Sequence, residues 1–128
     1  MRLLLDTHVL LWWLAGSRKL PPSVREVIAD ESSDIWVSAA SAWEIAIKKS
    51  LGKLSAPDDL LDQLDDNGFE SLPILVADAL EAGALPPHHD DPFDRMLVAQ
   101  ARLSGLTLVT GDARMAAYDV LRMDAGAQ

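Results

Sequence analysis

The sequence predicts an α/β fold, a three-layer α/β/α sandwich around a central, mainly parallel sheet. Short apolar runs rich in Leu, Ile and Val alternate with longer segments of helical periodicity. This alternation is typical of parallel strands that connecting helices bury on both faces. A chain of 128 residues, 49% of them hydrophobic, has room for one such core. We therefore expect a single domain over residues 1–128.

The chain opens with a strand and two helices. Three consecutive leucines predict a buried strand at residues 3–5. The apolar crowding after it predicts a helix over residues 8–15, closed by Gly16, because glycine readily adopts the left-handed conformation that ends helices. A Pro-Pro-Ser sequence then introduces a helix over residues 24–30, with Ser23 as its cap.

The middle of the chain contains the next strand and the clearest helix. Residues 34–37, Asp-Ile-Trp-Val, predict a second buried strand. Residues 41–51 carry a wide apolar stripe that stops at Gly52, which predicts a helix. An acidic amphipathic helix is expected over residues 57–67. A short extended segment is expected over residues 72–74 at a sheet edge, where proline is tolerated.

The last third of the chain continues the alternation of helices and strands. A short helix is expected over residues 76–84, and a Pro-rich loop follows it. Proline at the first helical position then introduces a helix over residues 93–103. The run Leu-Thr-Leu-Val-Thr predicts a strand at residues 106–110, followed by a short helix at 113–117 and a last strand at 120–122.

The charge is strongly acidic and unevenly distributed. The net charge of −9 argues against simple electrostatic attraction to nucleic acid, which normally rests on Lys and Arg. The excess acid is concentrated in residues 54–94, which contain no Lys or Arg. No apolar stretch approaches the roughly 20 residues that cross a bilayer, and the chain has no cysteine. We expect a cytoplasmic protein without a membrane segment.

Four acids stand where the carboxyl edge of the sheet is expected. Asp6 directly follows a strand, Asp112 lies in the turn after another, and Glu44 and Asp94 lie in the first turns of helices. Each has an ordinary alternative role as a helix cap or as a partner of the helix dipole. Four carboxylates at one edge, however, would repel one another unless a cation lay among them. The pattern therefore predicts a metal site formed by Asp6, Glu44, Asp94 and Asp112.

The ligand types indicate which metal this site would hold. Oxygen ligands without cysteine favour Mg²⁺, with Mn²⁺ as a substitute, over zinc. A softer site at His8, His88 and His89 is the alternative, but these residues lack the spacing of zinc ligands. Carboxylate-bound Mg²⁺ suits phosphate chemistry, and it would let an acidic protein accept a polyanion.

Basic and hydroxyl side chains near the acids are candidates for substrate contacts. Lys48 lies four residues after Glu44, so an ordinary i,i+4 ion pair is the alternative to a phosphate contact. Lys49 and Arg95 can rim the site, with simple solvation as their alternative. We assign Lys48, Lys49, Arg95 and Thr110 as candidate substrate-binding residues. Further candidates for the rim are Lys53, Arg102 and Arg114.

Four short motifs, which occur in order along nearly the whole chain, carry a family resemblance. Together they resemble the PIN-domain ribonucleases, specifically the VapC-type toxins of bacterial toxin–antitoxin pairs. The motifs are Leu-Leu-Leu-Asp6-Thr-His, Ser38-x-x-Ser41-x-Trp-Glu44-Ile-x-x-Lys48 with Gly52-Lys53-Leu54 following, Asp91-Pro-Phe-Asp94-Arg-x-Leu, and Leu108-Val-Thr110-Gly-Asp112.

The resemblance implies a fold, an activity and a partner. It implies a PIN-like sandwich, Mg²⁺-dependent endoribonuclease activity on RNA phosphodiester bonds, and inhibition by a small VapB-like antitoxin. It also implies a homodimer or a toxin–antitoxin hetero-oligomer. The acids that the family uses for catalysis and metal binding fall on Asp6, Glu44, Asp94 and Asp112. Asp90 departs from the pattern, because relatives often have a basic residue there, so local substrate contacts are expected to differ.

The resemblance also suggests where an antitoxin would bind. We expect it to cover apolar surface near Trp12, Trp13 and residues 41–51, and to extend an Arg or Lys toward the carboxylates in place of the metal. Such a cation would satisfy the acids and block the entry of phosphate together.

Three other classes of protein were weighed against this one. A haloacid-dehalogenase-type phosphatase requires Asp-x-Asp-x-Thr, but the third position is His8. A phosphoacceptor receiver domain requires paired acids near the first strand and a Lys after the late strand. This chain has the single acid Asp6 at the first strand and no Lys after Thr110. The remaining alternative is a PIN-fold binding module that acts through partner contacts with little catalysis. A cleavage assay separates that module from an enzyme.

Overall fold

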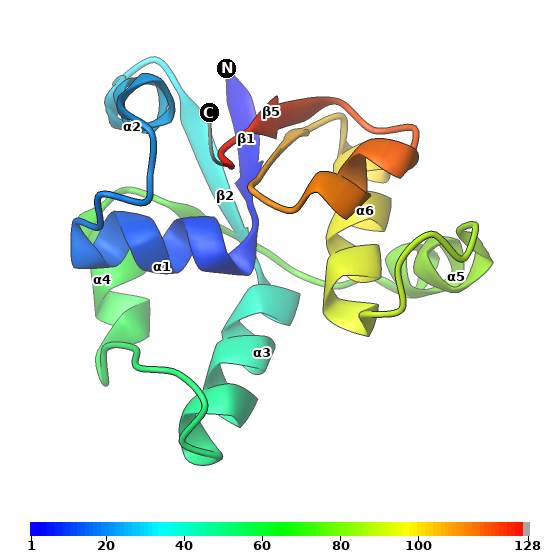
Figure 1. The fold of residues 1–128 in the computed structure, drawn as a ribbon, viewed down its shortest axis with the longest axis horizontal. Helices are drawn as coiled ribbons and strands as arrows, with labels where there is room; N and C mark the ends of the chain where they lie inside the picture. Colours follow the sequence, from blue (N-terminus) through cyan, green and yellow to red (C-terminus); the bar gives the residue numbers. More distant parts are fainter. Residues whose placement is uncertain (127–128) are drawn as a thin grey trace.

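The computed structural model describes residues 1–126, which are built around a five-stranded sheet (Figure 1). The strand order is β3-β2-β1-β4-β5, and every neighbouring pair is parallel. The predicted α/β class and parallel sheet are therefore confirmed. The strands are β1 (Arg2–Leu5), β2 (Asp34–Ser38), β3 (Glu70–Leu72), β4 (Thr107–Thr110) and β5 (Arg122–Asp124).

Helices cover both faces of the sheet (Figure 1). Helices α1, α2 and α4 lie on one side, α5 and α6 lie on the other, and α3 continues directly from the end of β2. No helix within residues 1–126 is long and apolar enough to cross a membrane. The helices are α1 (Thr7–Ala15), α2 (Pro22–Ala29), α3 (Ala39–Ser50), α4 (Leu60–Asp66), α5 (Val76–Ala84) and α6 (Pro92–Ser104), with a 3₁₀ helix η1 (Ala113–Ala117).

The central strand β1 divides the core into two halves. Successive strand side chains point to opposite faces, so Leu3 and Leu5 pack with Val9 and Leu10 of α1, whereas Leu4 packs with the residues of α6. All three strand leucines are completely buried. At about 1.5–3 kcal/mol for each fully buried side chain, they anchor the layers around the strand that carries Asp6.

Several element boundaries differ from the predicted ones. Helix α2 begins at Pro22 without a side-chain cap, so the expected cap at Ser23 is wrong. The strand expected over residues 72–74 lies at Glu70–Leu72, because Pro73 has no N–H to continue the ladder with β2. The last strand is Arg122–Asp124 rather than 120–122, since its register is set by pairing with β4.

The topology brings the carboxyl ends of β1, β2 and β4 to one end of the sheet. Ligand sites of open parallel sheets lie at this end. Because β1 and β4 are neighbours, Asp6 N–H donates to Val109 O at 2.9 Å, and the segment after each strand turns into the same region. Helix α3 contacts both α1 and α6 there.

Candidate metal centre

Asp6 lies between strand β1 and helix α1 and is held in one orientation. Its side chain is buried, Oδ1 accepts from Thr7 N–H at 2.7 Å, and Oδ2 accepts from the Thr110 hydroxyl at 2.6 Å. His8 Nδ1 lies 3.5 Å from Oδ2. Burial raises the pKa of the Asp6 carboxyl, against the lowering effect of His8 and the two hydrogen bonds.

His8 links this acid to the turn after β4. Gly111 N–H donates to His8 Nε2 at 2.8 Å, so the proton of the neutral ring lies on Nδ1, the nitrogen that faces Asp6. A Cβ added at Gly111 would lie 3.1 Å from His8 Nε2. This close approach explains the glycine between Thr110 and Asp112.

Thr110 couples two of the acids. It is completely buried at the end of β4, where its hydroxyl donates to Asp6 Oδ2 and accepts from Asp112 N–H at 3.0 Å. The Thr110 hydroxyl is therefore already engaged by two partners at the acidic edge. The substrate contact expected of this residue stays a prediction.

Glu44 projects from α3 with one unpaired oxygen. The residue is 5% exposed, Oε2 accepts from Lys48 Nζ at 2.6 Å, and Oε1 has no hydrogen-bond partner although it is buried. The i,i+4 pair is therefore present, and it raises the pKa of Lys48. A buried carboxylate oxygen without a partner is costly, so Oε1 marks a place for a donor or a cation.

Asp94 lies in the first turn of α6, which Asp91 caps by accepting from the N–H groups of Phe93 and Asp94 at 2.8 and 3.2 Å. Burial, followed by repulsion from Asp6, Asp91 and the other acids of the group, raises the pKa of Asp94 to about 8. Of the four predicted acids, Asp94 is therefore the one at which repulsion from the other carboxylates is most pronounced.

Asp112 has the opposite electrostatic environment. Arg114 donates Nε to Oδ1 at 3.1 Å, an Nη to Oδ2 at 2.8 Å and its backbone N–H to Oδ1 at 2.9 Å. The hydrogen bond from the Arg114 guanidinium holds the pKa of the Asp112 carboxyl well below its usual range. Of the rim residues suggested by the sequence, Arg114 is therefore the one that pairs with a predicted acid at this edge.

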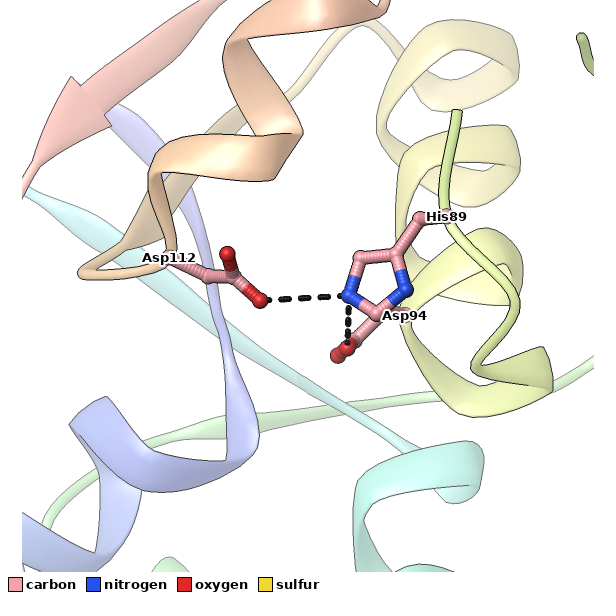
Figure 2. A group of neighbouring side chains, drawn as sticks. All are labelled: His89, Asp94 and Asp112. Atoms are coloured by element: carbon pink, nitrogen blue, oxygen red, sulfur yellow. Dashed lines mark hydrogen bonds and ion pairs between the residues drawn. The ribbon is translucent and has the colours of Figure 1, made fainter. Parts of the chain in front are cut away.

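His89 also lies among these acids, although its sequence context indicated only an alternative zinc site. Its ring lies between Asp94 and Asp112, with Nε2 2.9 Å from Asp94 Oδ2 and 3.1 Å from Asp112 Oδ2 (Figure 2). The residue is 5% exposed although it belongs to a Pro-rich loop. The only sequence signal was the pair His88-His89 just before the third motif. The spacing of this pair is wrong for zinc, and the sequence gives no sign of its hydrogen bonds.

Three of the four predicted acids, Asp6, Glu44 and Asp94, line a cavity of about 270 Å³ between α1, α3 and α6, and Arg114, the partner of Asp112, lines it too. The chemistry of its lining fits a hard divalent cation, because the donors are carboxylate oxygens and Glu44 Oε1 is buried without a partner. Burial and, after it, repulsion from the neighbouring acids raise the pKa of Asp94, so a cation among these carboxylates would favour its charged form. The lining includes Asp6, Glu44, Asp91, Asp94, Lys48 and Arg114.

Two of the expected substrate contacts have other partners. The guanidinium of Arg95 donates to Ala82 O at 2.9 Å and Leu85 O at 3.0 Å, so it satisfies carbonyls at the end of α5. Lys49 forms an ion pair with Asp58, in the segment before α4. Lys48 remains at the cavity, 41% exposed and paired with Glu44.

These features define a parallel α/β domain with an acidic centre at the carboxyl end of its sheet. A model of the PIN domain matches residues 3–121, and the chain belongs to this family. The resemblance drawn from the four motifs is therefore confirmed at the family level.

Individual relatives narrow the comparison to VapC-type proteins. The chain is 30% identical over 118 residues to "Ribonuclease VapC22" of Mycobacterium tuberculosis, with 90% of each chain covered. A chain of the VapBC2 structure from Rickettsia felis, bound to a DNA fragment from their promoter, matches with a TM-score of 0.71 at 15% identity, covering 97% of this chain and 98% of that one. A chain of a toxin–antitoxin complex from Klebsiella pneumoniae matches with a TM-score of 0.68 at 18% identity, covering 95% and 96%.

Proposed function

We propose that the protein is a Mg²⁺-dependent endoribonuclease of the VapC toxin type, with Asp6, Glu44, Asp94 and Asp112 as its metal-binding and catalytic acids. The observation that carries this proposal is the buried, unpaired Oε1 of Glu44 beside the raised pKa of Asp94. Both features are relieved if a cation enters the group. The similarity to Ribonuclease VapC22 supports RNA as the substrate class.

The acids would bind the cation from different elements and in different protonation states. Asp6, just before α1, and Glu44 of α3 present buried carboxylates, and Asp94 presents one that must lose its proton before it can bind metal. When bound, Mg²⁺ supplies Lewis acidity toward a phosphoryl oxygen and lowers the pKa of water. Mn²⁺ should substitute for it, because both ions prefer oxygen ligands.

Positive charge at the rim would hold the RNA backbone. Lys48 and Arg114 both line the cavity, and each is paired with an acid of the centre. If the cation takes over the carboxylates, these two side chains are released toward the phosphates. This arrangement explains how a chain with a net charge of −9 accepts a polyanion.

We further propose that a small VapB-like antitoxin restrains this activity in the cytoplasm, and that the protein forms a homodimer or a toxin–antitoxin hetero-oligomer. Two solved structures similar in fold are a VapBC2 assembly and a toxin–antitoxin complex. An antitoxin Arg or Lys inserted among the acids would compete with the cation for the same carboxylates.

The test is cleavage of RNA by the purified protein, with new 5′ ends mapped. We expect cleavage with Mg²⁺, none after chelation, recovery on adding the metal back, and none for Asp6→Asn or Glu44→Gln. Asp62→Asn is the matched control, because it removes the same charge from an exposed position on α4. If the wild type cleaves no RNA under conditions in which it binds Mg²⁺, the chain is better described as a binding module.

A further inference from the structure

The hydrogen-bond partners of His89 decide which of its nitrogens can act on the acids. Asp91 N–H donates to His89 Nδ1 at 3.1 Å, so Nδ1 uses its lone pair as an acceptor and carries no proton. The proton of the neutral ring therefore lies on Nε2. Nε2 is the nitrogen that faces both Asp94 and Asp112 (Figure 2).

This tautomer makes His89 a donor to the acids rather than a ligand of the metal. Although His89, Asp94 and Asp112 lie close enough together to resemble a three-residue metal site, a protonated Nε2 has no lone pair to offer. Nε2 forms a hydrogen bond with Asp112 Oδ2 at 3.1 Å, and Asp94 Oδ2 lies 2.9 Å from the same nitrogen. These two acids come from different elements, α6 and the turn after β4.

The loop holds the imidazole in place from behind. The His89 side chain is 3% exposed, and its backbone carbonyl accepts from Arg95 Nη1 at 3.4 Å. The same guanidinium donates to Pro86 O at 3.2 Å and to Leu85 O at 3.0 Å. Arg95 therefore holds the loop by its carbonyl groups, and the loop in turn holds the His89 ring between Asp94 and Asp112.

We propose that His89 is a positioning residue of the metal centre, whose Nε2–H holds the carboxylates of Asp94 and Asp112 together for metal binding. This inference rests on the proposed function and specifies how the site is organised. Hydrogen bonds to ligating carboxylates orient them, and loss of such a partner typically weakens metal binding about 10–100-fold. His89 contributes in this way without touching the metal.

Two substitutions separate the two hydrogen bonds of the ring. His89→Gln places an amide nitrogen near the position of Nε2, so it keeps a donor toward the acids and loses the acceptor for Asp91 N–H. His89→Asn keeps an acceptor near the position of Nδ1 and has no donor long enough to reach the acids. His88→Gln and His88→Asn are matched controls, because His88 is exposed and its ring contacts Tyr118.

The first measurement is Mg²⁺ affinity by calorimetry, with folding checked by circular dichroism. We expect His89→Asn to bind Mg²⁺ about 10–100-fold more weakly, and His89→Gln and both His88 variants to bind it nearly as the wild type does. Wild-type affinity in His89→Asn overturns the proposal. Weak binding in His89→Gln together with wild-type binding in His89→Asn also overturns it, because the bond to the loop would then be the important one.

The second measurement is the ¹⁵N spectrum of the histidine rings in the wild type, with the His89 signals assigned by their absence from His89→Gln. We expect the Nε2–H tautomer both in chelator and with Mg²⁺; an Nδ1–H tautomer, or loss of the Nε2 proton on adding Mg²⁺, overturns the proposal. The tautomer itself is read from the wild type, and the variant serves only to assign the signals. RNA cleavage then distinguishes the two proposals. If the wild type cleaves RNA and His89→Asn binds Mg²⁺ as the wild type does, only the proposed role of His89 is refuted. If the expected affinity pattern is found but the wild type cleaves no RNA, only the proposed ribonuclease activity is refuted.

Discussion

Asp94→Asn should stabilise the metal-free protein while abolishing its activity. The pKa of Asp94 is raised from 3.8 to about 8, so the native state keeps a proton that the unfolded chain releases. Stability therefore falls as pH rises from about 4 through about 8, since protons are bound more tightly by the native state. Asparagine has a similar shape and carries no charge, so it removes this dependence.

The size of the effect follows from the pKa shift. One pKa unit corresponds to about 1.4 kcal/mol, and pH 7 lies roughly three units above the ordinary value, so the ceiling at pH 7 is about 4 kcal/mol. Neighbouring acids that share protons with Asp94 reduce this figure, and we expect a gain of about 2 kcal/mol. For a domain of this size that gain raises the melting temperature by several degrees.

Urea denaturation in chelator between pH 6 and pH 9 tests this reasoning. The free energy of unfolding of the wild type should fall as pH rises to about 8, by no more than about 1.4 kcal/mol per pH unit. The stability advantage of Asp94→Asn over the wild type should grow with pH at the same rate. Mg²⁺ should stabilise the wild type and not the variant. Asp62→Asn, in the exposed face of α4, is the control. An Asp94→Asn protein less stable than wild type at pH 8 in chelator would refute the assigned electrostatics.

The other acids and their partners give three further predictions. Glu44→Gln should reduce Mg²⁺ affinity in calorimetry while the circular dichroism spectrum is unchanged, because it replaces the unpaired buried oxygen with a neutral amide. Arg114→Gln should raise Mg²⁺ affinity, measured the same way, since the guanidinium no longer competes for Asp112. Thr110→Val should lower the free energy of unfolding in urea by about 1–3 kcal/mol, because Asp6 loses a buried donor.

Much of the architecture was already determined by local sequence. Three leucines before Asp6, the apolar stripe of α3 and the strand before Thr110 specify buried strands and an amphipathic helix, and parallel strands must end at a common edge. Asp6 at the end of the first strand and Asp112 in the turn after β4 were therefore placed at one edge of the sheet by chain order alone. The i,i+4 pair of Glu44 and Lys48 is equally local, because helix geometry brings such residues together.

Only the tertiary structure decided how these acids differ from one another. Asp94 and Asp112 look alike in the sequence, yet burial among carboxylates raises the pKa of the first, and Arg114 lowers that of the second. The contacts of Thr110 with Asp6 and of His89 with Asp112 were equally hidden, because these partners are distant in the chain. A pKa and a hydrogen bond depend on distances of a few ångströms between residues from different elements. Those distances are set by how the layers pack, and local sequence patterns do not contain them.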